Sequence, residues 1–106
     1  MIFRRKSRYV LIEPSRQIDM SQKESWSALR EELAKFMGEK SYIDANPFLI
    51  EGSSAGNFII RVSRGSERQL ILALSFIKCI GPAEIGFYTI KTSGTIRSLR
   101  VKGKKL

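Results

Sequence analysis

The first β-strand of the chain is predicted by the stretch Arg8-Tyr9-Val10-Leu11-Ile12-Glu13. Its β-branched, aromatic and aliphatic side chains suit a pleated surface, and Pro14 closes it because proline cannot donate a hydrogen bond to a sheet. Three later stretches have the same character, at residues 48–50, 58–62 and 87–92. A polar turn at residues 53–56 joins the first two of these into a hairpin.

Two helices are predicted between the strands, and each begins with a capping box. Ser21 with Glu24 forms the first box, and Ser66 with Gln69 forms the second. Gly38 is expected to stop the first helix, and Gly81-Pro82 the second. Apolar residues recur at helical spacing after each box: Trp26, Leu29, Leu33, Phe36 and Met37 in the first helix, and Leu70, Ile71, Leu74 and Ile77 in the second.

The element order is β-α-β-β-α-β, which predicts an α+β, ferredoxin-like two-layer sandwich. We expect a four-stranded antiparallel sheet with strand order 4-1-3-2. Residues 1–106 then form a single domain, with a basic N-terminal arm (residues 1–8), a core (residues 8–94) and a basic C-terminal segment (residues 95–106). A short helix is predicted over residues 96–102, with Thr95 as its N-cap and Gly103 as its stop.

Charge is concentrated at the two ends of the chain. The formal net charge is +9, yet residues 9–96 contain ten basic and ten acidic side chains and are neutral. The excess comes from nine terminal residues: Arg4, Arg5, Lys6, Arg8, Arg97, Arg100, Lys102, Lys104 and Lys105. Either tail alone could be a solvated, frayed end. Two basic tails on a neutral body favour binding to a polyanion.

The predicted topology brings these tails together, because the start of the first strand lies beside the end of the fourth. A phosphate backbone is the polyanion that best fits such a patch, and its binding would depend strongly on salt. The turn Ser93-Gly94-Thr95 could present backbone N–H groups and hydroxyls to a phosphate oxygen. An ordinary helix cap with a glycine turn explains the same residues.

The sheet face away from the helices is predicted to be apolar. Phe58, Ile60 and Val62 alternate toward the helices and fill the core. The opposite face would carry Tyr9, Leu11, Ile59 and Phe87. A face with these side chains is too apolar to remain exposed to solvent. We expect the C-terminal segment or a protein partner to cover it, although Tyr9 could instead stack on a base.

Several classes of function find little support. The chain has no histidine, and its one cysteine, Cys79, is expected to be a small buried hydrophobe rather than a nucleophile. We expect no cofactor, no metal site and no catalytic residue. Arg61 and Asn57 near Gly56 could mimic a small phosphatase of this topology, but the phosphate loop is missing. No membrane span or signal peptide is predicted, so a cytoplasmic protein is expected.

Four stretches together resemble the Pop-five family, a small ribonuclease P protein shared by archaea and eukaryotes. They are residues 8–13, the pair Asn46-Pro47, Gly56 followed by residues 59–62, and Thr92-Ser93-Gly94-Thr95-Ile96-Arg97. The last motif is the most specific, and the similarity covers residues 8–102. The region of residues 55–58 is bulkier than the family's Gly-rich version, which puts the contacts of the hairpin in doubt.

The resemblance implies a subunit of ribonuclease P, the enzyme that removes the 5′ leader from precursor tRNA with RNA and Mg²⁺ doing the chemistry. Its implied partners are ribonuclease P RNA and a TIM-barrel-like protein subunit, with two such pairs joined through this chain as a homodimer within a heterotetramer. RNA contacts are implied for Arg97, Arg100 and Lys102, and Arg4, Arg5, Lys6 and Arg8 would extend the patch. The alternatives are a general RNA- or DNA-binding protein, ribosomal or chromatin-like, and a ferredoxin-like enzyme or ligand sensor.

Overall fold

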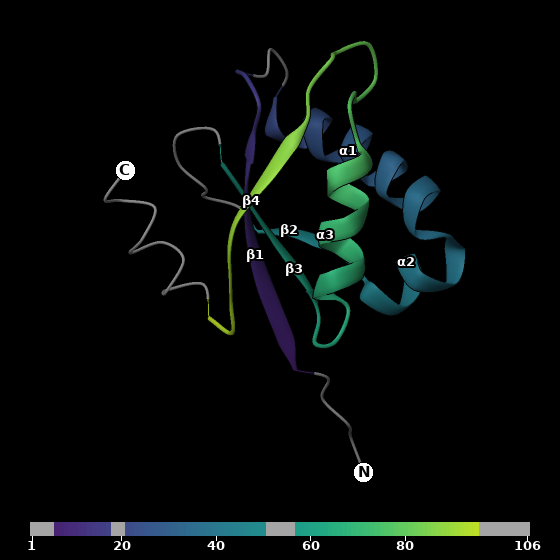
Figure 1. Cartoon of the computed structure of the whole chain (residues 1–106), viewed down its shortest axis with the longest axis vertical. Coiled ribbons are helices and arrows are strands. Elements are labelled where there is room, and N and C mark those ends of the chain that lie inside the picture. The colour runs from purple at the N-terminus through teal and green to yellow at the C-terminus, as the bar shows by residue number, and fades with distance from the viewer. Residues whose placement is uncertain (1–5, 18–20, 51–56, 96–106) are drawn as a thin grey trace.

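The computed structural model describes residues 6–17, 21–50 and 57–95, and its helices lie on one face of a four-stranded antiparallel sheet (Figure 1). The strand order is β2-β3-β1-β4, which confirms the predicted ferredoxin-like α+β topology. In chain order the elements are β1 (Ser7–Pro14), α1 (Gln22–Met37), α2 (Glu39–Ala45), β2 (Phe48–Ile50), β3 (Phe58–Ser63), α3 (Glu67–Phe76) and β4 (Phe87–Ser93).

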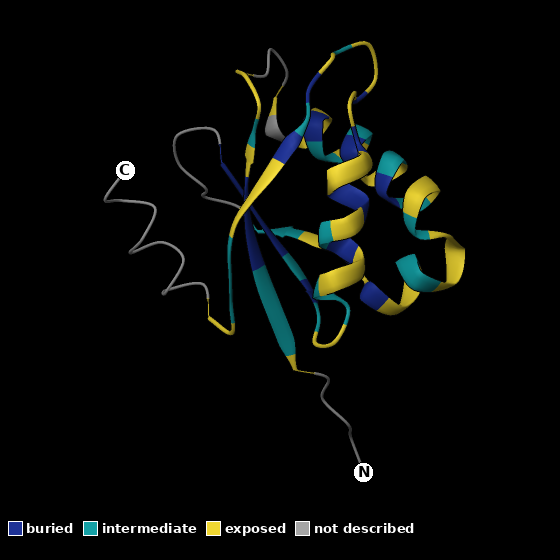
Figure 2. Ribbon diagram, viewed as in Figure 1, coloured by how far each residue is buried: buried dark blue, intermediate teal, exposed yellow. Residues whose placement is uncertain are grey.

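The core lies between the sheet and the helices, as the dark blue positions of Figure 2 show. Alternate residues of β1 and β3 face it, and they meet one stripe each of α1 and α3. The side chains at its centre are at most 2% exposed: Val10, Ile12, Leu29, Leu33, Ile60, Val62, Leu70 and Leu74. Burying this stripe and these strand faces is what joins the two layers.

The first helix begins as predicted but is followed by a helix that was not. The Ser21 hydroxyl accepts a hydrogen bond from the Glu24 backbone N–H at 3.2 Å, which confirms the cap. Gly38, with φ of +84°, ends α1, and its carbonyl accepts from Tyr42 N–H to start α2. The prediction missed α2 because seven residues are too few to show an apolar period.

One predicted core position of α1 is only half covered. The side chain of Phe36 is 49% exposed, and its ring stacks on that of Phe76 with centroids 6.1 Å apart. Phe36 therefore lies at the edge of the α1–α3 contact rather than inside the core.

The second capping box is not formed. Ser66 makes no side-chain cap, and the Glu67 carboxylate instead accepts a hydrogen bond from the Gly65 backbone N–H. The prediction was wrong because the backbone of Ser66, with φ of −104° and ψ of 3°, lacks the extended conformation of a capping residue.

The end of α3 also differs from the prediction. The helix stops at Phe76, and Ile77 is extended yet buried. Gly81-Pro82 forms a tight turn between Ile80 and Ala83, whose backbones exchange hydrogen bonds of 2.9 and 3.0 Å. Because the chain leaves the helix early, Cys79 is exposed, and the expectation that it is buried was wrong.

A bulge in β4 changes which side chains face the helices. Leu11 pairs with Lys91, but Ile12 pairs with Thr89, so Ile90 is an extra residue in β4. Strict alternation would place Phe87 on the open face; the bulge turns it toward the helices instead. There it is 7% exposed, and its ring centroid lies 6.2 Å from that of Phe58. The assignment of Phe87 to the open face was therefore wrong.

Several predicted features fall outside the described residues. They are the N-terminal residues 1–5, the hairpin turn at residues 53–56 and the helix over residues 96–102. Within residues 6–17, 21–50 and 57–95, no helix has the length and apolar character needed to cross a membrane.

Candidate nucleic-acid interface

The start of β1 and the end of β4 lie at the same edge of the sheet. Tyr9 lies opposite Ser93 in their antiparallel pairing, so the chain enters β1 where it leaves β4. A shallow hollow of about 450 Å³ marks this place, lined by Lys6, Ser7, Arg8, Tyr9, Arg64 and Gly94. The structure thus brings Lys6 and Arg8 beside the Ser93-Gly94-Thr95 turn.

Arg64 is a third basic contribution to this edge that the sequence did not reveal. It follows β3, and its backbone N–H donates to the Lys6 carbonyl at 2.8 Å. The pairing of Ser7 with Ser63 sets this contact. The predicted strand order could have revealed it. Because β1 and β3 are antiparallel neighbours, the residue that follows β3 lies near the start of β1.

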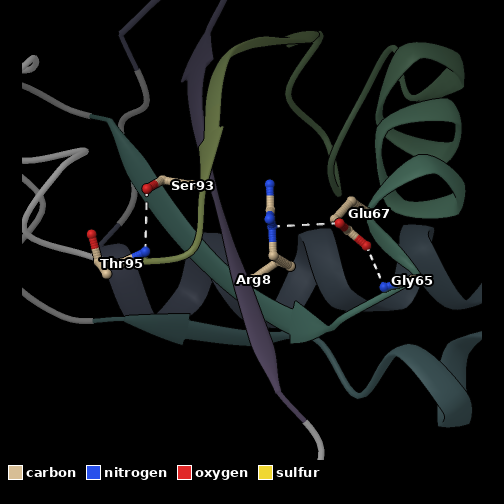
Figure 3. A network of polar contacts seen from close by, with 5 residues as sticks. All are labelled: Arg8, Gly65, Glu67, Ser93 and Thr95. Atoms are coloured by element: carbon tan, nitrogen blue, oxygen red, sulfur yellow. Dashed lines mark hydrogen bonds and ion pairs between the residues drawn. The ribbon is translucent and has the colours of Figure 1, made fainter.

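Arg8 is already engaged by a carboxylate. It pairs with Val62 on the helix side of the sheet, and its Nε lies 3.5 Å from Glu67 Oε2 (Figure 3). The pKa of Glu67 is lowered, chiefly by its own backbone N–H and then by that of Gly65, with Arg8 and Arg64 attracting the charge while burial opposes the shift. A phosphate at Arg8 would have to compete with an ionised Glu67.

The Ser93-Gly94-Thr95 turn satisfies part of its own hydrogen bonding. The Thr95 backbone N–H donates to the Ser93 hydroxyl at 3.2 Å (Figure 3), so this N–H is already paired with a side chain. Gly94 is exposed, and a Cβ built on it would meet nothing within 4 Å. The turn therefore offers open space at Gly94 rather than a row of unpaired donors.

The open face of the sheet is covered in part. Leu11 and Ile59 are only 4% and 2% exposed although they face away from the helices, and Tyr9 and Ile50 pack against them. The expectation of a covered apolar surface is met at Leu11 and Ile59.

Beside this covered part, the open face is accessible. Tyr88 stands where Phe87 was expected and is 64% exposed. The Arg61 guanidinium lies 5.0 Å from the centroid of the Phe48 ring, a cation–π contact. Asn57, the other candidate for a phosphatase-like pair, is buried.

The remaining candidate residues lie outside the described residues: Arg4, Arg5, Arg97, Arg100 and Lys102. Within the described ranges, no group of three or more histidine, cysteine, aspartate or glutamate side chains could hold a metal ion. The chemistry that the described residues offer at the edge is that of basic side chains around an open hollow.

A profile of the Rpp14/Pop5 family matches residues 8–103, which is most of the chain and includes all of β1 but Ser7, as well as the Ser93-Gly94-Thr95 turn. The chain belongs to the Rpp14/Pop5 family. Two proteins are similar to it, both named ribonuclease P protein component 2. The protein of Methanoculleus marisnigri is 34% identical over 101 residues, covering 92% of this chain and 61% of that protein. That of Methanocorpusculum labreanum is 31% identical, covering 93% and 67%.

This Rpp14/Pop5 chain thus spans about 61% of the length of the Methanoculleus protein. A solved structure agrees with its fold. A chain of the cryo-EM structure of yeast ribonuclease MRP matches with a TM-score of 0.65, covering 99% of this chain and 96% of that chain at 8% identity. At so low an identity the match shows the fold alone, and it shows that this topology spans nearly the whole of both chains.

Proposed function

We propose that this Rpp14/Pop5 chain is a protein subunit of ribonuclease P that supports the catalytic RNA in removing the 5′ leader from precursor tRNA. The observation that carries the proposal is the register of β1 with β4, in which Tyr9 lies opposite Ser93. This register brings Lys6 to the turn before the basic C-terminal segment, and the β1–β3 pairing adds Arg64 to the same edge. Membership of the Rpp14/Pop5 family supports the same function, as do the two relatives named ribonuclease P protein component 2.

The chain would act by charge rather than by catalysis. Folding an RNA core brings phosphates close together, and basic side chains lower that repulsion while releasing condensed counterions. The RNA would carry out the cleavage with Mg²⁺, and the protein would let that RNA fold at a lower Mg²⁺ concentration. Arg97, Arg100 and Lys102 would contact the backbone, with Arg4, Arg5 and Lys6 extending the contact.

The accessible part of the open face is a candidate for protein contact. Tyr88 is 64% exposed there, and Ile90, the extra residue of the β4 bulge, is 39% exposed. Exposed aromatic and aliphatic side chains of this kind are typical of protein interfaces. We assign a TIM-barrel-like subunit as the partner, and a homodimer of this chain would join two such pairs into a heterotetramer.

The decisive experiment is reconstitution. Ribonuclease P RNA and the barrel-like subunit are assembled with and without this chain, and leader cleavage of precursor tRNA is measured as Mg²⁺ is lowered. We expect the chain to shift the Mg²⁺ requirement downward. Equal cleavage in both arms would contradict the proposal, and equal affinity for ribonuclease P RNA and an arbitrary duplex would favour a general nucleic-acid binder.

A further inference from the structure

We propose that the hollow between the start of β1, the β3–α3 turn and the end of β4 takes one phosphate group of an RNA backbone, held by Lys6 and Arg64. This inference rests on the proposed function and deepens it by naming one contact point. Arg64 lies far from both basic tails in the sequence. The site therefore exists only because the fold joins three separate segments.

The two cations are held by backbones that are hydrogen-bonded to each other. Arg64 N–H donates to the Lys6 carbonyl at 2.8 Å, and Ser7 pairs with Ser63 just inside that bond. Both side chains are exposed at the rim of the hollow. A cationic pair on a fixed backbone loses less conformational freedom when it binds an anion than two independent tails would.

The distribution of acidic groups selects this hollow over its neighbour. An adjoining hollow is also lined by Lys6 and Arg64, but Asp44 lines it too and would repel an anion. The hollow on the Gly94 side has no acidic side chain among its lining residues. The carboxylate of Glu67, which follows the β3–α3 turn, is turned to Arg8 and to the Gly65 N–H (Figure 3). Arg8 is thereby partly neutralised, while Lys6 and Arg64 make no ion pair within the described residues.

Gly94 leaves the side of the hollow open. A Cβ built at this position meets no protein atom within 4 Å, and the backbone does not have the left-handed φ that would strain alanine. The protein therefore has no steric need for glycine here. Because Gly94 lines the hollow, a methyl group there would add to the lining and change the room beside a bound phosphate.

The first test compares Arg64→Gln with Arg68→Gln in the reconstituted complex with ribonuclease P RNA. Arg68 is an exposed arginine of α3 that does not line the hollow, so it is the matched control. Losing one phosphate contact should make the slope of log K against log salt less steep by roughly 0.7–0.9. We expect this change for Arg64→Gln only. Equal slopes for the two variants, in a complex where the wild-type chain binds RNA, would overturn the proposal but leave the proposed function intact.

The second test uses Gly94→Ala, with Gly86→Ala as control. Gly86 also lacks a left-handed φ, and an added Cβ there makes only an ordinary 3.7 Å contact. We expect Gly94→Ala to weaken RNA binding at an unchanged melting temperature, and Gly86→Ala to bind RNA as the wild type does. Unchanged RNA affinity in Gly94→Ala would contradict a phosphate bound against Gly94.

A third arm distinguishes an RNA phosphate from free phosphate. The full chain is titrated with inorganic phosphate and with a short single-stranded RNA, and the backbone amides of Ser7, Arg64 and Gly94 are followed by NMR. The proposal expects these amides to respond to RNA at far lower concentration. Equal affinity for the two ligands would overturn it. A wild-type chain that does not bind RNA in the holoenzyme would overturn both this inference and the proposed function.

Discussion

Tyr9 lies directly opposite Ser93 across the β1–β4 pair. This pairing places two residues that are more than eighty positions apart in sequence at the same edge of the sheet. Because the strands are antiparallel, the start of β1 lies beside the end of β4, and Lys6, Arg8 and Gly94 line one hollow there. Within the described residues, the basic side chains gathered at this edge are Lys6, Arg8 and Arg64.

Charge reversal in the C-terminal segment tests the role of that edge. Replacing Arg97 and Arg100 with glutamate should weaken RNA binding and flatten its salt dependence without unfolding the chain, because contacts to phosphate are lost while the neutral body is untouched. The salt slope is measured by titration at several ionic strengths. The control reverses Arg30 and Lys78, two exposed cations of the helical side. An unchanged slope in the Arg97/Arg100 variant would count against the proposed RNA contact.

Removing the charge of Glu67 should lower stability by about 1 kcal/mol at neutral pH, because the variant loses a charge-assisted bond to Gly65 N–H and a partly exposed pair with Arg8. Glu67→Gln is compared in urea unfolding with Glu13→Gln, whose carboxylate is exposed on the other face of β1. Equal loss in both variants would show that the Glu67 contacts contribute nothing specific.

The same variant should reveal a pH dependence. The folded pKa of Glu67 lies below 4.5, so the unfolded chain binds this proton more tightly than the folded chain does. The stabilisation is therefore present in full above pH 4.5 and is lost as pH falls through the lower folded pKa. The difference in unfolding free energy between the wild type and Glu67→Gln should shrink over that range. A constant difference would mean that ionisation of Glu67 does not stabilise the fold.

The two serines at the helix starts should behave differently although the sequence presents both as caps. Ser21→Ala should cost about 1 kcal/mol, because the Ser21 hydroxyl caps the Glu24 N–H. Ser66→Ala should have a much smaller effect, because Ser66 makes no side-chain cap bond. Thermal unfolding of the two variants measures the contrast, and similar losses would contradict the difference between the two helix starts.

Two leucines of α3 test which stripe of the helix is buried. Leu74 is 1% exposed, and Leu74→Ala should lower stability by about 2–5 kcal/mol. Leu72 is 53% exposed, and Leu72→Ala should change stability by no more than about 0.5 kcal/mol. Chemical unfolding compares them, and a large loss for Leu72→Ala would mean that its side chain is covered.

The bulge in β4 makes a similar contrast between neighbouring aromatic residues. Phe87→Ala should cost about 3–5 kcal/mol, since the ring is 7% exposed and packs beside Phe58. Tyr88→Ala should cost far less, because Tyr88 is 64% exposed. Without the bulge the order of the two effects would be reversed, so the comparison by urea unfolding tests the register directly.

The sequence predicted those features that depend on local pattern. Strands were recognisable at residues 8–13 and 58–62 from their composition, and the cap at Ser21 and the stop at Gly38 from residue type. The order of the elements then predicted the strand order, because the split β-α-β arrangement leaves few ways to cover a sheet from one side. Counting charged residues along the sequence likewise showed that the excess positive charge lies at the two ends of the chain.

Tertiary structure alone decided the rest. The inward turn of Phe87 and the pairing of Glu67 with Arg8 both depend on residues far apart in sequence. Arg64 reaches the basic edge only because its N–H bonds to the Lys6 carbonyl, a partner 58 residues away by number. Periodicity and capping are properties of a few consecutive residues, so the sequence is enough to predict the helices and strands. Their order along the chain then predicts the topology. Bulges and charge pairs are settled only when distant segments compete for the same space and the same hydrogen bonds.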